Sequence, residues 1–307
     1  MTPPRICVVG ASNIDLVSYV PRMPKIGETL HGTQFAIGYG GKGANQAVMA
    51  AKLGGEVAMV TKLGRDIFGE DTYKNYEAFG IDTTGVTFTD QAFSGVAPIA
   101  VNPEGDNSII IVTGANDVLN QDDLEAVREI IAASQVLVCQ LEISVETNLA
   151  ALRLGKELGV QTIFNPAPAR AELPEEIYGL CDIFCPNETE TELLTGMPVT
   201  SMEEAEAAAR VLMQRGCKMV ILTLGERGSL LVSDDEVVHV AAEAVKPKDT
   251  TGAGDAFVGS LAYFLAAGKP LQDAMHRANK IAAISVQAPG TQTSFPDAKD
   301  LDPDLLA

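Results

Sequence analysis

The residues best suited to chemistry lie in a glycine-rich loop toward the carboxyl end of the chain. It reads Asp249-Thr-Thr-Gly-Ala-Gly-Asp255 and runs directly into an apolar segment, 256–267, with helical character. Amides at a helix start are free to hold an anion, and Asp255 falls in the first turn beside them. This arrangement suits phosphoryl transfer to a hydroxyl, with the carboxylate as the base. Taken alone, the loop fits equally well a helix whose Asp255 is only a capping acid.

A second glycine cluster, Gly-Tyr-Gly-Gly-Lys-Gly-Ala-Asn-Gln, occupies residues 38–46. Its G-x-G-x-x-G spacing keeps a Rossmann-type dehydrogenase open, although that motif should directly follow the first strand of the fold. It is not a Walker A loop, because Lys42 is followed by Gly43 instead of Ser or Thr. The alternative is sugar binding, in which glycine backbone approaches a ring while Lys42 and Asn45 donate hydrogen bonds to hydroxyls.

Further polar residues follow the expected strands, namely Asn13, Asp15, Glu142, Asn187, Glu190 and Thr223. Glu142 is left free for function, because Ser144 is the better cap for the next helix. Asn187 and Glu190 are three residues apart and share one face of a helix start. That pair suits the water shell of Mg²⁺, or is simply an acidic first turn. The glycines in 223–228 allow a ligand to approach closely, or form a plain turn.

The elements that must position these residues alternate between short β-branched runs and amphipathic helices. We expect strands at 6–10, 57–63, 136–141, 162–164, 183–185 and 219–224. We expect helices at 44–53, 69–79, 121–133, 145–158, 202–215 and 254–267. This alternation predicts an α/β fold, a three-layer sandwich with a mostly parallel central sheet. Ligands of such sheets bind beyond the carboxyl ends of the strands.

Two segments depart from this alternation. Residues 29–37 and 95–112 alternate apolar and polar side chains, and 101–107 has the composition of a hairpin turn. We therefore expect a small antiparallel β lid, inserted at about 15–38 and 93–113 in a single domain of residues 1–307. It would serve as a lid over the site, as an oligomer surface, or as a mere edge extension.

Composition excludes several classes of function. The chain has 307 residues, 46% of them apolar, and a net charge of −19, so nucleic acid and anionic membranes are not expected partners. No apolar stretch is long enough to cross a bilayer. The five cysteines include no C-x-x-C pair and the three histidines are scattered, which argues against a zinc site. Without a secretory signal, and with cysteines expected as buried free thiols, we expect a cytoplasmic protein.

Two motifs together resemble a known family. Gly40-Gly-Lys-Gly-Ala-Asn-Gln-Ala47 and Asp249–Asp255 resemble the two signatures of the ribokinase-like (PfkB-type) carbohydrate kinases. The resemblance covers nearly the whole chain, including Asn-Ile-Asp at 13–15, Asn-x-x-Glu at 187–190, Thr-Leu-Gly at 223–225 and Gly-Thr-Gln-Thr-Ser at 290–294. The unbroken Gly-Gly-Lys-Gly-Ala-Asn-Gln, with Asn13, Asp15 and Glu142, is most similar to the ribose-phosphorylating members.

The resemblance assigns roles to individual residues. It implies that Asp255 is the catalytic base and that Gly252, Ala253 and Gly254 form an anion hole over the transferring γ-phosphoryl group. It implies sugar contacts at Asn13, Ile14, Asp15, Gly41, Lys42, Gly43, Ala44, Asn45, Glu142 and Asp255. It implies an ATP site at Asn187, Thr223, Leu224, Gly225, Glu226, Arg227, Gly228, Gly254 and Asn279. It implies Mg²⁺ near Glu190 through water, and K⁺ at Asp249, Thr251, Ser285, Ala288, Gly290 and Ser294.

The reaction implied is ATP-dependent phosphorylation of D-ribose at its 5-hydroxyl to give D-ribose 5-phosphate, by a homodimer formed through the lid. Alternatives are another sugar or nucleoside kinase of the family, acting for example on fructose or deoxyribose, and a non-catalytic sugar-binding regulator on the same fold. Two residues depart from the family pattern beside the expected potassium loop. Lys248 stands where relatives usually carry an apolar residue, and Pro289 removes one N–H.

Overall fold

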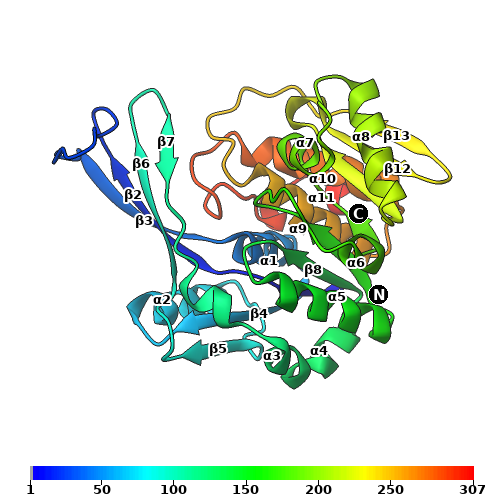
Figure 1. Cartoon of the computed structure of the whole chain (residues 1–307), viewed down its shortest axis with the longest axis horizontal. Coiled ribbons are helices and arrows are strands. Elements are labelled where there is room, and N and C mark those ends of the chain that lie inside the picture. The colour runs from blue at the N-terminus through cyan, green and yellow to red at the C-terminus, as the bar shows by residue number, and fades with distance from the viewer. Residues whose placement is uncertain (1–2) are drawn as a thin grey trace.

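A computed structural model describes residues 3–307, in which nine strands form the central sheet (Figure 1). Their order is β13-β12-β11-β10-β9-β8-β1-β4-β5. The strands are β1 (Arg5–Val9), β4 (Glu56–Gly64), β5 (Val86–Thr89), β8 (Val136–Gln140), β9 (Gln161–Asn165), β10 (Ile183–Phe184), β11 (Met219–Thr223), β12 (Ser229–Ser233) and β13 (Val237–Val240). Every pair from β11 to β5 is parallel, and β12 and β13 extend the sheet in antiparallel fashion.

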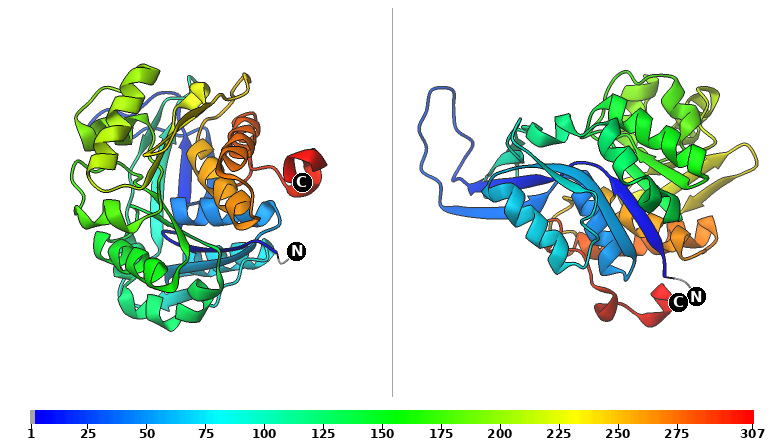
Figure 2. Two further views of the ribbon diagram at one scale, coloured as in Figure 1. Left: turned by 90° about the vertical axis from the view of Figure 1, so that its right-hand side faces the viewer. Right: turned by 90° about the horizontal axis from the view of Figure 1, so that it is seen from below.

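Helices cover both faces of this sheet, as the views in Figure 2 show. One core contains Cys7 and Val9 of β1 and the helices α3 (Gln121–Ala126), α4 (Arg128–Ala133), α5 (Val145–Leu158), α6 (Glu176–Leu180), α7 (Glu188–Thr195) and α8 (Met202–Gln214). The other contains Ile6 and Val8 and the helices α1 (Lys42–Lys52), α2 (Ile67–Ala78), α9 (Ala253–Ala266), α10 (Leu271–Ser285) and α11 (Pro303–Leu306). The strands are apolar on both faces because both faces are buried. The predicted three-layer α/β class is confirmed.

Two helix predictions differ from the structure. The helix expected at 121–133 is divided at Val127, whose φ of −114° and ψ of 18° lie outside the helical region. Helix α10 was not expected, although its buried positions, such as Ala274 and Ala278, recur at helical spacing. Pro270 precedes it, so the chain turns sharply between α9 and α10. Within the described residues, no helix combines the length and apolarity required to cross a bilayer.

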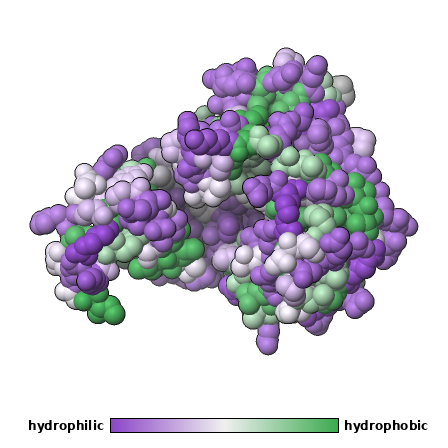
Figure 3. All heavy atoms as spheres, turned by 90° about the horizontal axis from the view of Figure 1, so that it is seen from above, coloured by the Kyte–Doolittle hydropathy of each residue, from purple (hydrophilic) through white to green (hydrophobic). Residues whose placement is uncertain are grey.

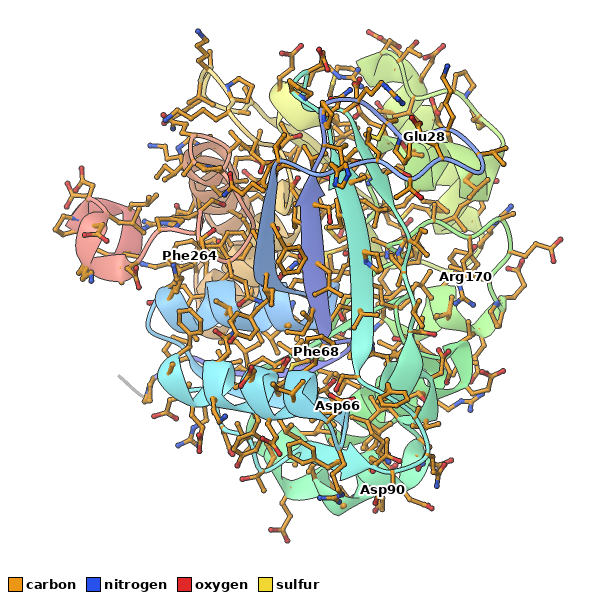
Figure 4. The ribbon with its side chains drawn as sticks, turned by 90° about the vertical axis from the view of Figure 1, so that its left-hand side faces the viewer. Glu28, Asp66, Phe68, Asp90, Arg170 and Phe264 are labelled. Carbon is orange, nitrogen blue, oxygen red and sulfur yellow. The ribbon has the colours of Figure 1, made fainter. Side chains whose placement is uncertain are left out.

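A second sheet of four strands projects from one side of the body and is called the lid below (Figures 1 and 4). It contains β2 (Asn13–Tyr19), β3 (Gln34–Gly40), β6 (Gly95–Val101) and β7 (Asn107–Ile109), in the order β3-β2-β6-β7. Both outer pairs are antiparallel, and the hairpin expected at 101–107 is confirmed. The central pair, β2 and β6, is parallel, however, because both strands leave the same side of the body.

Asp66 fastens the base of the lid to the body (Figure 4). Its carboxylate caps α2 by accepting the amide of Gly69, and it also accepts the amide and hydroxyl of Ser94, directly before β6. These hydrogen bonds lower the pKa of Asp66, although its partial burial acts in the opposite direction. The lid strand therefore starts from an anchored point.

Candidate active site

Helix α1 begins at the carboxyl end of β1 because glycines let two backbones touch. A Cβ on Gly43 would lie 2.7 Å from the carbonyl carbon of Gly10, and Gly41 takes a left-handed φ of 88° at the helix cap. The amide of Ala44 then donates to the carbonyl of Ala11 at 3.0 Å. This close approach places Lys42 and Asn45 beyond the edge of the sheet, where ligands of parallel sheets bind.

Asp255 lies in the first turn of α9 and is buried, with 6% of its surface exposed. Its Oδ2 accepts a hydrogen bond of 2.9 Å from the side-chain amide of Asn45. Its Oδ1 accepts one of 3.0 Å from the side-chain amide of Gln46. The two glycine-rich motifs, far apart in the sequence, thus meet at this carboxylate. The cap of α9 is Gly252, and the carboxylate of Asp255 accepts its hydrogen bonds from another helix, so Asp255 does more than cap α9.

Several charged side chains surround this carboxylate. Burial raises the pKa of Asp15 to about 6, with further contributions from the negative charges of Glu142 and Asp255. Burial also raises the pKa of Glu142, although Lys42 opposes the shift through its charge and its backbone hydrogen bond. The negative charge of Asp255 is the largest cause of the raised pKa of Lys42. Burial lowers this pKa, and the charges of Glu142 and Glu190 raise it further. The predicted sugar-contacting charges are therefore mutually close.

The loop before α9 has the geometry of an anion cradle. Gly252 caps the helix with a left-handed φ of 80° and uses no side chain for the cap. A Cβ on Gly252 would overlap the side chain of Thr291, whereas the position of a Cβ on Gly254 meets no atom within 4 Å. The backbone of this loop therefore packs against Thr291 at Gly252 and has open space beside Gly254. Its first amides, together with the helix dipole, favour an anion at the open side.

The residues expected at the nucleotide meet at the ends of β10 and β11. The amide of Thr223 donates to the carbonyl of Pro186 at 3.0 Å, which brings Thr223 beside Asn187. Gly228 has a left-handed φ of 93°, and a Cβ there would lie 2.1 Å from the carbonyl oxygen of Val240, so the position requires glycine. Asn279 lies nearby and donates to the hydroxyl of Ser229 at 3.1 Å. Glu226 is exposed, Leu224 is buried, and Arg227 pairs with Glu188.

Asn187 and Glu190 form a capping box at the start of α7. The amide of Asn187 donates to Glu190 Oε2 at 2.8 Å, and its side-chain amide donates to Oε1 at 3.0 Å. Burial raises the pKa of Glu190, which is 4% exposed, and the backbone hydrogen bond from Asn187 opposes the rise. Glu190 therefore stabilises the helix start while it remains close to Lys42 and Asp255.

Asp249 joins the two loops expected to hold a potassium ion. One oxygen accepts the amide of Thr251 at 2.9 Å, and the other accepts the amide of Gly290 at 2.9 Å. Burial opposes ionisation, but these hydrogen bonds together lower the pKa of Asp249. Lys248 is exposed, as is Pro289. Within 3–307, no group of three or more His, Cys, Asp or Glu is arranged to hold a metal ion.

The structure does not bring every predicted residue into the cluster. Ile14 is 1% exposed and, by the alternation of β2, its side chain lies on the face opposite Asp15. Gly43 packs against Gly10, and Ala44 is buried in the core. Ser285 is buried and donates its hydroxyl to the carbonyl of Ala282.

The sequence reasoning missed a set of side-chain amides behind Asn45 and Asp255, all of them buried except the half-buried Asn75. The set consists of Gln46, Asn75, Gln140, Asn165 and Gln292, linked by the hydrogen bonds Gln46–Asn165, Gln140–Gln46, Gln292–Asn45 and Asn75–Gln292. One signal was available, because Gln140 is a polar residue inside an otherwise apolar buried strand. Such a side chain requires a partner.

The surface between lid and body is hollowed, and the floor of the hollow is largely hydrophilic (Figure 3). A separate cavity of about 770 Å³ lies at the amino ends of β1 and β4, where Arg5, Glu56 and Asp82 contribute to its wall. None of the predicted site residues lines that cavity. The chemistry-bearing residues gather at the opposite, carboxyl end of the strands.

Comparison with known proteins agrees with this site. The sequence matches the family described as pfkB family carbohydrate kinase over residues 3–298. It is 49% identical over 300 residues to ribokinase of Mus musculus, covering 96% of this chain and 93% of the mouse protein. It is 46% identical over 297 residues to deoxyribokinase of Salmonella typhi, covering 97% of each.

A solved structure of Arabidopsis thaliana ribokinase complexed with ribose and ATP has the same fold. Its TM-score is 0.90 at 32% identity, and the match covers 100% of this chain and 99% of that chain. The expected family is thereby confirmed. The chain belongs to the pfkB family of carbohydrate kinases, and it is a sugar kinase.

Proposed function

We propose that this enzyme transfers the γ-phosphoryl group of ATP to the 5-hydroxyl of D-ribose, giving ADP and D-ribose 5-phosphate. The observation that carries the proposal is the hydrogen bond between Asn45 and Asp255, which joins the sugar motif to the candidate base at 2.9 Å. The mouse relative is a ribokinase, and the Arabidopsis relative was solved with ribose and ATP. Both support ribose and ATP as the substrates.

In this mechanism Asp255 accepts the proton of the sugar hydroxyl while the hydroxyl oxygen forms a bond to the γ-phosphorus. The bond between that phosphorus and the bridging oxygen of ADP breaks, and the electron pair leaves with ADP. Backbone amides at Gly252–Gly254 donate hydrogen bonds to the transferring group, in the space that is open beside Gly254. Because these amides are already oriented by α9, little reorganisation is required.

The charges of the site support a role for a divalent cation. Asp15, Glu142, Glu190 and Asp255 oppose the single cation Lys42, so a triphosphate would enter a site that already carries excess negative charge. We expect Glu190 to hold Mg²⁺ through water, because its carboxylate has free lone pairs beyond the two bonds from Asn187. When bound, Mg²⁺ offsets the charge of the phosphates.

The oxygen-rich loops at 249–251 and 285–294 fit a monovalent cation. The residues expected there offer the carboxylate of Asp249, whose two oxygens each accept one amide, and carbonyls such as those of Ala288 and Gly290, which suit hard cations. The hydroxyls of Ser285 and Ser294 donate to the carbonyls of Ala282 and Thr291, so they could offer only their lone pairs. A bound K⁺ would add positive charge behind the anion cradle. Replacing K⁺ by a tetraalkylammonium salt at constant ionic strength should lower turnover, and unchanged turnover would contradict this part.

The choice between ribose and 2-deoxyribose needs a direct test, because a relative of similar identity is a deoxyribokinase. An ADP-release assay with ribose, 2-deoxyribose, fructose and adenosine, together with NMR of the sugar product, tests it. We expect the highest kcat/KM with ribose and phosphorylation at the 5-position. A higher kcat/KM with 2-deoxyribose would contradict the sugar assignment alone. ADP release that no sugar stimulates would contradict the proposed function.

We also propose a homodimer through the outer face of the lid. Leu16 lies opposite Ile37, and Ser18 lies opposite Phe35, on the face that points away from Asp15. Phe35 and Ile37 are 58% and 60% exposed. Figure 4 looks at the lid from the side away from the body. Exposed apolar residues on that face favour burial against a second copy of the chain.

A further inference from the structure

The carboxylate of Asp255 is held by two side-chain amides from consecutive residues of α1. Asn45 binds Oδ2, and Gln46 binds Oδ1. Asn45 belongs to the expected sugar contacts, whereas Gln46 has no assigned role. Gln46 is fully buried and points between α1 and the sheet. Asn45 therefore approaches the carboxylate from the expected sugar site, and Gln46 approaches it from the core.

The orientation of the Gln46 amide follows from its neighbours. The side-chain amide of Asn165 donates to the backbone carbonyl of Cys185 at 2.8 Å, and a carbonyl can only accept. The Oδ1 of Asn165 must therefore face Gln46, which donates to it at 3.1 Å. The remaining N–H of Gln46 is then directed at Asp255.

Gln140 fixes the other end of the same amide. Its Nε2 donates to Oε1 of Gln46 at 2.8 Å, from inside a completely buried strand. Its own Oε1 accepts no hydrogen bond among residues 3–307, and an unpaired buried acceptor destabilises a fold. Gly10 makes room for it, because any Cβ there would overlap that oxygen. The side-chain amide of Gln140 is thus buried with its oxygen unpaired, and its side-chain hydrogen bond is the one to Gln46.

We propose that Gln46 is a positioning residue that anchors Oδ1 of Asp255, and that Gln140 and Asn165 hold Gln46 in the donating orientation. The inference rests on the proposed function, in which Asp255 is the base. With Oδ1 anchored from the core, Oδ2 is the oxygen that faces the sugar and accepts its proton. Asn45 can exchange its bond to Oδ2 for a bond to the sugar, while Gln46 keeps its own.

Gln46→Met tests the proposal, because methionine has a similar length and no N–H. Single-turnover phosphorylation of ribose is measured at saturating ribose, with ribose affinity measured separately. Loss of the donor that holds Oδ1 should lower the single-turnover rate about tenfold, because the base is then less well positioned. Ribose affinity should change by less than about threefold, since Gln46 does not reach the cleft. Gln140→Met should lower the rate in the same way by less.

Thr162→Val is the matched control for lost stability. Thr162 lies on β9 with Asn165, is fully buried, and bonds Asp182 at the opposite end of the strand. It should lower stability to urea while leaving the single-turnover rate at saturating ribose unchanged. If Gln46→Met fails to fold, Gln140→Met decides the question.

The outcomes separate the inference from the proposed function. A single-turnover rate at saturating ribose that stays within about threefold of the parent rate in both glutamine variants overturns the role of Gln46. A rate loss that Thr162→Val shares overturns it as well. Asp255→Asn is measured alongside them. If it is inactive while both glutamine variants keep the parent rate, only the role of Gln46 is wrong. If it remains active, Asp255 is not the base, and the proposed mechanism fails with it.

Discussion

The backbone amide of Lys42 donates a hydrogen bond of 2.7 Å to the carboxylate of Glu142, which joins the start of α1 to the residue pair that follows β8. The cap of α1 is Gly41, which has no side chain to offer, so Glu142 supplies the missing acceptor from another element. The same carboxylate is an expected sugar contact. Positioning of the helix and of the sugar site thus depend on one bond.

Asp15 should make the ligand-free enzyme less stable as the pH rises. Its pKa is raised from 3.8 to about 6 in the folded protein, which therefore binds this proton more tightly than the unfolded chain does. The resulting stabilisation is complete below about pH 4 and is lost as the pH rises through about 6. Asp15→Asn should accordingly be more stable than the parent by about 3 kcal/mol at about pH 8, and equally stable at about pH 4.

Urea denaturation without sugar or nucleotide measures this difference. Asp235→Asn is the control, because Asp235 is exposed and lies in the turn between β12 and β13, outside the site. A stability gain for Asp15→Asn that is the same at both pH values would count against the electrostatic explanation. The variant should also lose affinity for ribose, so stability and sugar binding change in opposite directions.

Gly252→Ala should slow catalysis more than it destabilises the fold. A Cβ at this position would displace Thr291 and shift the amides of the anion cradle. We expect kcat to fall at least about tenfold, since misplaced donors stabilise the transition state poorly. Gly268→Ala is the control at the other end of α9, because Gly268 has a φ of 78° but open space around it. Both variants carry the strain of a left-handed alanine, roughly 1 kcal/mol.

Steady-state kinetics and thermal unfolding of the two glycine variants distinguish the effects. If both variants lose a similar amount of stability and only Gly252→Ala has a much lower kcat, the result supports the role of the anion cradle in the reaction. Equal kcat values in the two variants would mean that the loop geometry before α9 does not matter for the reaction.

Ile37→Lys should convert the proposed dimer into a monomer. The lysine would place a charge on the apolar outer face of the lid, where burial without a partner is costly. Sedimentation velocity of the variant should show half the mass of the parent. Val237→Lys, on the edge strand β13 where Val237 is 39% exposed, should leave the mass unchanged. A parent protein that sediments as a monomer would refute the lid dimer.

The central sheet could be predicted from the sequence, because continuous apolar strands separated by helices report burial on both faces locally. The lid strands could also be predicted from their alternation. The parallel pairing of β2 with β6 could not, since it depends on where two distant segments leave the body. The break at Val127 is likewise a backbone adjustment that the apolar pattern of 121–133 does not report.

The site residues that could be predicted from the sequence are those whose own side chains carry the chemistry. Residues that act by holding another side chain could not be predicted. Asp255 and Lys42 carry charges within recognisable motifs, and the structure places them together. Gln46 lies inside one of the same motifs, but its meaning depends on Asn165 and Gln140, which belong to other strands. Such a contact exists only after the chain has folded.

The most direct test of the account is the rate of ribose-dependent ADP release by Asp255→Asn. The asparagine keeps the size of the side chain and removes the ability to accept a proton as a carboxylate. We expect turnover to fall by at least about a hundredfold, while ribose still binds to the variant as measured by calorimetry. Near-normal turnover by a folded, ribose-binding Asp255→Asn enzyme would contradict the assignment of Asp255 as the base.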